Sequence, residues 1–136
     1  MIRERRGLRA GREFQFVDAD PMRAVGALVE KINEWGVSKV KVDVIGVGWG
    51  IAGRLKELSS RHNPTGAGHT THHAEVVGVN VAEKATPGNE GRFLNLRAQI
   101  WWEVGREYSR LGLWDLTALD DDVIAELSAP SSTIRA

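Results

Sequence analysis

The sequence predicts an α/β fold in which a mixed sheet is flanked by helices. Two apolar runs, at residues 40–45 and 75–81, have the composition of strands that are buried on both faces. Apolar residues at helical spacing lie between them, and a strand–helix–strand unit implies a right-handed crossover and a parallel pair. An alternating segment at the start of the chain predicts a hairpin, whose antiparallel strands make the sheet mixed.

The first predicted element is this hairpin, with strands at residues 2–6 and 13–17 and a turn at residues 7–11. The first twelve residues contain Arg3, Arg5, Arg6, Arg9 and Arg12. Because alternate residues of a strand share a face, we expect Arg3 and Arg5 to project together. Two interpretations stay open: these arginines contact phosphates, or they protect an edge strand by their charge.

A helix is expected next. Asp20 can accept a hydrogen bond at its N-terminus, and Pro21 suits the first helical position. Gly36 is suited to the position just past the helix end. One apolar stripe at three- and four-residue steps comprises Val25, Leu28, Val29, Ile32 and Trp35.

Spacing also predicts the later elements. In order, we expect a helix marked by Ile51, Leu55 and Leu58, a flexible polar loop at 61–73, a loop at 85–91, a long helix at 93–111 and a short acidic-capped helix at 120–127. Trp101 and Trp102 point about 100° apart on a helix, so only one of them can face the core squarely. Residues 1–130 are expected to form one domain, followed by a frayed tail at 131–136.

Composition excludes several classes of function. The chain contains no cysteine, which excludes disulfides and thiolate metal sites. No apolar run approaches the roughly 20 residues of a membrane helix, and the basic N-terminus lacks the apolar core of a signal peptide. We therefore expect a cytoplasmic protein that has no membrane partner. The formal net charge of zero neither favours nor excludes nucleic acid as a partner.

One aspartate interrupts the first apolar strand. Asp43 lies near the carboxyl end of this strand, where α/β sheets place their ligands, and it precedes a glycine-rich turn at residues 46–50. A buried carboxylate needs a counter-charge, so Asp43 is expected to hold a divalent cation or to pair with an Arg or Lys side chain. Further acids for an Mg²⁺ or Mn²⁺ site would come from Glu75, Glu83 and Asp120–Asp122.

Three glycines beyond Asp43 match the G-x-G-x-x-G pattern of dinucleotide-binding turns. They are Gly48, Gly50 and Gly53. An acid that binds ribose should end the next strand, but Glu75 begins it instead. We favour a structural role, in which the glycines let the chain leave the strand sharply and let the helix pack closely.

Four histidines form a second candidate cluster of ligands. They are His62, His69, His72 and His73, and three of them fall within five residues. Metal ligands need support from surrounding side chains, which a segment rich in Gly and Thr does not offer. We therefore favour a solvated surface loop over a metal site.

Several ordered segments together resemble the nuclease domain of the large terminase subunit of tailed bacteriophages. They are residues 42–48, Arg54-Leu55, residues 76–80, residues 83–85, residues 93–98, Trp101-Trp102 and residues 121–127. The resemblance covers nearly the whole chain, from about residue 2 to residue 130.

This resemblance implies a ribonuclease H-like fold and a phage or prophage enzyme of genome packaging. The implied reaction is endonucleolytic cleavage of double-stranded DNA that depends on Mg²⁺ or Mn²⁺, and Asp43 matches the family's second acid. Lys84 and Arg97 would lie near the DNA path, together with Arg3 and Arg5 of the hairpin. The other partners implied are the terminase ATPase domain, the small terminase subunit and the portal.

The sequence also departs from the family. The family's first acid lies on a strand before the opening hairpin and its last acid lies in a later helix, and neither is seen here. We therefore expect a fragment with an incomplete sheet, weak metal affinity, and weak or absent cleavage. An open sheet edge predicts a homo-oligomer or the addition of a strand from a partner. A non-catalytic interaction module and a nucleotide-binding protein remain alternatives.

Overall fold

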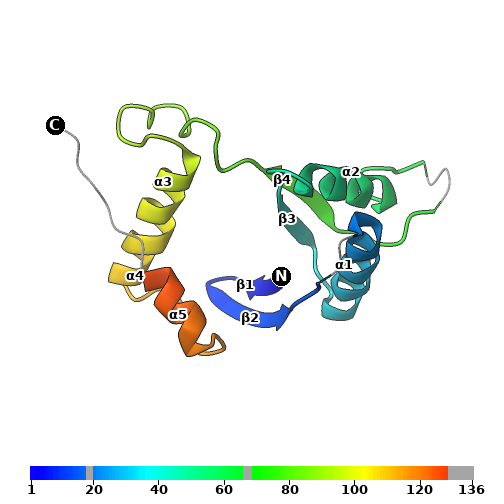
Figure 1. Ribbon diagram of the computed structural model, residues 1–136, viewed down its shortest axis with the longest axis horizontal. Coiled ribbons are helices and arrows are strands. Elements are labelled where there is room, and N and C mark those ends of the chain that lie inside the picture. Colours follow the sequence, from blue (N-terminus) through cyan, green and yellow to red (C-terminus); the bar gives the residue numbers. More distant parts are fainter. Residues whose placement is uncertain (18–19, 66–68, 129–136) are drawn as a thin grey trace.

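The computed structural model describes residues 1–17, 20–65 and 69–128. Its elements are β1 (Ile2–Arg6), β2 (Arg9–Phe14), α1 (Pro21–Trp35), β3 (Lys39–Asp43), α2 (Gly48–Leu58), β4 (Glu75–Val79), α3 (Leu96–Ile100), the π-helix η1 (Trp101–Glu107), α4 (Tyr108–Arg110) and α5 (Asp121–Ser128). Figure 1 shows the β1–β2 hairpin between a unit made of α1, β3, α2 and β4 and an arm made of the later helices. The tail expected at 131–136 lies outside the described residues.

The strands form two separate pairs. β1 and β2 are antiparallel, and β3 and β4 are parallel in a register that runs from Lys39 opposite Glu75 to Asp43 opposite Val79. The predicted α/β class and the parallel pair are confirmed. The prediction of one mixed sheet is wrong for the described part of the chain, because no strand there joins the two pairs.

The core lies on one face of the β3–β4 pair. Helices α1 and α2 contact each other, and their side chains pack with Val76 of β4 and the half-buried valines Val40 and Val42 of β3. The alternate residues Lys39, Lys41 and Asp43 are exposed. β3 is therefore covered on one face only, and the expectation that it is buried on both faces is wrong.

Helix α1 begins and ends as its sequence predicts. The Asp20 carboxylate accepts a hydrogen bond from the Met22 N–H at 2.9 Å, and Pro21 is the first helical residue. Gly36 follows the helix with a φ of 63°, a left-handed conformation that favours glycine. The Val37 N–H then donates to the Ile32 carbonyl at 3.0 Å, which ends the helix with a hydrogen-bonded turn.

The hairpin turn is tighter than predicted. The second strand begins at Arg9 rather than at residue 13, because Gly7 turns the chain with a φ of 58°. The register shifts between Arg3, which faces Glu13, and Arg5, which faces Ala10. One residue, Glu4, is therefore opposite two, which is a β-bulge.

At this bulge, Glu4 holds two arginines that connect the hairpin to α1. Its side chain is only 9% exposed, and it accepts hydrogen bonds from Arg12 at 2.6 Å and from Arg6 at 3.1 Å. Arg6 also donates to the Trp35 carbonyl at 2.9 Å, and the Arg12 guanidinium lies 5.1 Å from the centre of the Trp35 ring. The hydrogen bonds from Arg12 and then Arg6 outweigh burial and lower the pKa of Glu4 to about 2.

The arm is a continuous helix from Leu96 to Arg110, within the predicted range of 93–111. Its middle is π-helical, and Gly105 there approaches the Trp101 ring closely. Trp102 is half-buried beneath the Arg106 guanidinium, 4.1 Å away, while Trp101 is 38% exposed, so neither tryptophan is buried in a core. The arm joins the hairpin where Ala10 and Asp115 share a backbone hydrogen bond of 3.0 Å.

None of the helices in the described residues combines the length and the apolar character that crossing a membrane requires.

Two glycines of α2 should respond to alanine in opposite ways. A Cβ at Gly48 would overlap the Asp43 carbonyl oxygen, whereas a Cβ at Gly53 meets nothing within 4 Å. We expect Gly53→Ala to raise the free energy of unfolding by about 1 kcal/mol, since alanine loses less chain entropy in a helix. Gly48→Ala should lower it by about 1–3 kcal/mol through the overlap. Urea unfolding followed by circular dichroism checks both, and equal effects would contradict the packing described.

The Glu4 carboxylate should make stability fall in acid. Its pKa is about 2 in the folded protein against an ordinary value of 4.5, so the stabilisation is complete above pH 4.5 and is lost as the pH falls toward 2. The Glu4→Gln variant should be less stable at neutral pH and should show a shallower fall across this window. Thermal unfolding of both proteins between pH 2 and 7 provides the measurement, and parallel curves would contradict the network.

Candidate functional site

The candidate site lies at the carboxyl ends of β3 and β4. Asp43 is the last residue of β3 and pairs in register with Val79, the last residue of β4. The Asp43 side chain is exposed, and its Oδ1 accepts a hydrogen bond from the Ile45 N–H at 3.1 Å. The expectation of a buried Asp43 is therefore wrong, because it lies on the uncovered face of the strand.

Asp43 has no Arg or Lys partner within the part of the chain that the structure describes. Among the described residues it forms no ion pair, and Lys39, at the other end of β3, pairs with Glu75 at 3.2 Å. Glu75 begins β4 and so lies at the opposite end of the pair from Asp43. Within residues 1–17, 20–65 and 69–128, no group of three or more His, Asp or Glu side chains is placed to hold a metal ion.

This arrangement can be compared with a two-metal centre, in which two ions lie about 4 Å apart between several oxygen ligands. The described residues offer one carboxylate without an ion pair at the strand end and do not gather Glu83 or Asp120–Asp122 around it. On their own they therefore do not fit such a centre. What they do provide is a hard oxygen ligand that faces solvent, of the kind that Mg²⁺ and Mn²⁺ prefer.

A glycine turn holds the start of α2 against Asp43. Gly46 has a φ of 70°, and Gly48 comes so close to the Asp43 carbonyl that no side chain fits there. Gly48, Gly50 and Gly53 all lie inside α2. In a dinucleotide-binding turn the first two glycines lie in the loop before the helix. The fold therefore agrees with a structural role for these glycines, which is the role that the sequence favours.

Two of the candidate DNA-binding cations come from the loop and helix that follow β4. The Leu96 N–H donates to the Glu83 carbonyl at 2.8 Å, and the Arg97 N–H donates to the Val81 carbonyl at 3.0 Å. The start of α3 is thereby tied to the segment just after β4. Arg97 and Lys84, the residue after Glu83, are exposed, and neither forms an ion pair with another described residue.

The other two candidates, Arg3 and Arg5, lie on the hairpin. Arg3 forms an ion pair with Glu13, while Arg5 is exposed and has no ion pair within the described part of the chain. The bulge lies between them, so they do not share a simple alternating register. The hairpin is fastened beside Trp35, which precedes the amino end of β3. The four candidates therefore occupy two separate places.

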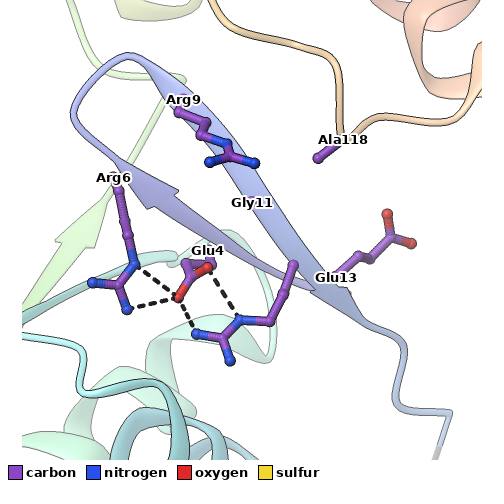
Figure 2. Close-up of a pocket in the computed structure, with 7 residues that line it drawn as sticks. Glu4, Arg6, Arg9, Gly11, Glu13 and Ala118 are labelled. Carbon is purple, nitrogen blue, oxygen red and sulfur yellow. Dashed lines mark hydrogen bonds and ion pairs between the residues drawn. The ribbon is translucent and has the colours of Figure 1, made fainter.

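A pocket of about 420 Å³ lies between the hairpin and Ala118 (Figure 2). The Glu4 carboxylate accepts hydrogen bonds from Arg6 and Arg12, and Figure 2 shows Arg6 directed toward it. Arg9, also in the lining, forms an ion pair with Asp115 at 3.6 Å. Because these charges are compensated within the protein, we assign the pocket a structural role.

His72 was expected in a solvated loop but is buried and fully hydrogen-bonded. Its Nε2–H donates to the Leu55 carbonyl at 2.9 Å, and its Nδ1 accepts from the Ala74 N–H at 3.2 Å. Burial is the main reason that the pKa of His72 lies below its usual value. The expectation of a solvated loop is therefore wrong at this residue.

Two further histidines of this segment are hydrogen-bonded. The Nε2 of His62 accepts from the Val76 N–H at 2.9 Å, and His73 is hydrogen-bonded to the Ser60 hydroxyl. His69 is exposed. The sequence does contain one sign of these roles, since His72 lies three residues before an apolar strand whose outer backbone groups need partners.

The chain matches no protein-family model, no curated protein and no solved structure. The fold and the site thus define an α/β protein with a candidate ligand site at the carboxyl end of a parallel strand pair.

His72 predicts a loss of stability in mild acid. Its folded-state pKa lies below the ordinary value of 6.5, so the stabilisation is complete above pH 6.5 and is lost as the pH falls through that value toward the folded-state pKa. We expect His72→Asn to be less stable at pH 8 and less sensitive to pH below 6.5. His69→Asn is the control, since His69 is exposed. Equal behaviour of the two variants in thermal unfolding would contradict this role.

Proposed function

We propose that this chain is a nuclease domain of ribonuclease H-like type, related to the large terminase subunit of tailed bacteriophages. Its proposed ligands are double-stranded DNA and Mg²⁺ or Mn²⁺. The observation that carries the proposal is the exposed Asp43 carboxylate at the carboxyl end of β3, on the same end of the unit as the segment that bears Lys84 and Arg97. Several of the segments that resemble the family, at residues 42–48, 83–85 and 93–98, lie on these same elements.

The chemistry of this end of the unit suits a phosphodiester. Asp43 supplies oxygen ligands that a divalent cation prefers, and phosphate oxygens supply more. Lys84 and Arg97 offer cations that can neutralise phosphates, and Arg97 can do so with two parallel hydrogen bonds. A single protein carboxylate holds a divalent cation weakly, so we propose weak metal affinity and slow cleavage. No cleavage step is assigned to the described residues.

The acid at the strand end provides the first test. We expect Mn²⁺-dependent nicking of a supercoiled plasmid to disappear in Asp43→Asn and to persist in Glu126→Gln, which removes an exposed acid of α5. Gel electrophoresis over a range of Mn²⁺ concentrations measures both. Cleavage that continues in the Asp43→Asn protein would refute the site, and circular dichroism verifies that each variant is folded.

The two cations provide a test that does not depend on cleavage. Each of Lys84→Gln and Arg97→Gln should weaken the binding of duplex DNA at all sequences and reduce the salt dependence, log K against log salt, by about 1. Lys56→Gln is the matched control, because Lys56 is exposed on α2. Fluorescence anisotropy at several salt concentrations provides the measurement. Equal losses in all three variants would indicate attraction by overall charge and would contradict a defined DNA path.

A further inference from the structure

A groove of about 610 Å³ lies beside α2, where this helix contacts β4. Trp49, Gly53 and Lys56 line it, and steps of four and three residues place them on one face of the helix. Val44, which follows β3, and Gly78 of β4 also line it, near the carboxyl ends of the two strands. The groove therefore lies at the end of the parallel pair, which is where α/β folds place ligands.

An exposed apolar turn leads into the groove. Trp49 is 76% exposed, and Ile45 and Val47, which precede it, are 49% and 72% exposed. Apolar surface that is contiguous in this way marks an interaction site. An indole has a flat face on which an aromatic ring can stack. This end of the groove therefore suits a ligand with a planar aromatic part.

Two glycines leave part of the groove wall without side chains. A Cβ at Gly50 or at Gly53 would meet nothing within 4 Å, unlike one at Gly48. No contact of α2 thus requires glycine at these two positions, although glycine is less stable than alanine inside a helix. Both glycines keep the wall flat, so that a planar ligand can approach the backbone closely.

Gly78 contributes one backbone donor to the groove. The Val44 N–H donates to the Val79 carbonyl at 3.1 Å, so Val79 faces β3 and Gly78 turns its N–H to the outer edge of β4. No described residue accepts from this N–H. A further strand does not fit the same edge, because the N–H of Val76 already donates to the His62 imidazole at 2.9 Å. Gly78 therefore offers an isolated donor, which suits a single acceptor atom of a ligand.

Lys56 carries the uncompensated charge of the groove. Arg54 and Glu57 also line it, but they neutralise each other in an ion pair of 2.8 Å. Lys56 forms no ion pair with another residue of the described ranges. It lies about 10 Å from Trp49 along the helix axis, a separation comparable with that between the base and the phosphate of one nucleotide. The groove thus combines a flat apolar end with a positive end.

We propose that this groove binds one unstacked nucleotide. The base lies against the Trp49 indole, the phosphate meets the Lys56 ammonium, and the Gly78 N–H donates to a ring nitrogen or carbonyl oxygen of the base. The source is a free mononucleotide or one unit of a single strand, since both present the same base and phosphate. A base in a duplex stays paired and stacked and does not enter the groove, so Lys56 takes no part in the duplex path proposed above.

The groove is separate from the candidate site at Asp43. Gly78 pairs in register with Val42, which packs with the core under the helices, whereas Asp43 lies on the uncovered face. Successive residues of a strand point to opposite faces, so the two sites face different sides of the sheet. This proposal does not depend on the nuclease proposal, because it uses no group of Asp43 and is tested by nucleotide binding.

Filling the groove provides the sharpest test. The probes are AMP and a short single-stranded oligonucleotide of deoxyadenosine, and isothermal titration calorimetry measures their binding. We expect Gly53→Leu to abolish the binding seen with wild type, with an intact fold in thermal unfolding. Gly26→Leu is the matched control and should bind as wild type does, because Gly26 is exposed on α1 and a Cβ there also meets nothing within 4 Å. Unchanged binding by a folded Gly53→Leu protein would overturn the proposal.

Two further variants separate the base from the phosphate. Trp49→Leu keeps an apolar side chain but removes the flat ring, and it should weaken AMP and adenosine alike by about tenfold. Lys56→Gln should weaken AMP by about tenfold and leave adenosine and duplex binding unchanged. A cation in the last turn of α2 also opposes the helix dipole. A Lys56→Gln protein that is less stable but still prefers AMP to adenosine would therefore contradict the phosphate contact.

The two probes identify the source of the nucleotide. An oligonucleotide that binds more tightly than AMP, and loses this affinity in Gly53→Leu, assigns the groove to a single strand. AMP that binds at least as tightly assigns it to a free nucleotide. A wild type that binds neither probe refutes the proposed site.

Discussion

The parallel pairing of β3 with β4 is the constraint on which the rest of the molecule depends. It places Asp43 and Val79 at one end of the unit, where the glycine turn follows β3 and the segment that is bonded to the start of α3 follows β4. It also turns one set of valines toward α1 and α2, so that the core forms on a single face. The uncovered face and the outer edge of β3 follow from the same pairing, and both bear the polar residues of that strand.

The exposure of two acidic side chains is the reverse of what their neighbours in the sequence suggest. Asp43 lies in an apolar run and was expected to be buried, yet it faces solvent. Glu4 lies among arginines in a strand with much polar character, yet its side chain is only 9% exposed. The difference arises from the partners each site provides, because a carboxylate can be buried where guanidinium groups surround it. The hairpin bulge supplies Arg6 and Arg12 to Glu4, whereas no guanidinium of the described residues forms an ion pair with Asp43.

Local chemistry made α1 predictable from the sequence, and the apolar runs placed β3 and β4. The ends of α1 are set by contacts within a few residues, made by Asp20, Pro21 and Gly36. The sequence alone therefore predicts where the helix begins and ends. The bulge at Glu4, the burial of His72 and the division of the strands into two pairs depend on contacts between distant segments. Of the candidate site, the position of Asp43 at a strand end was predictable, while its exposure depends on which face the helices cover.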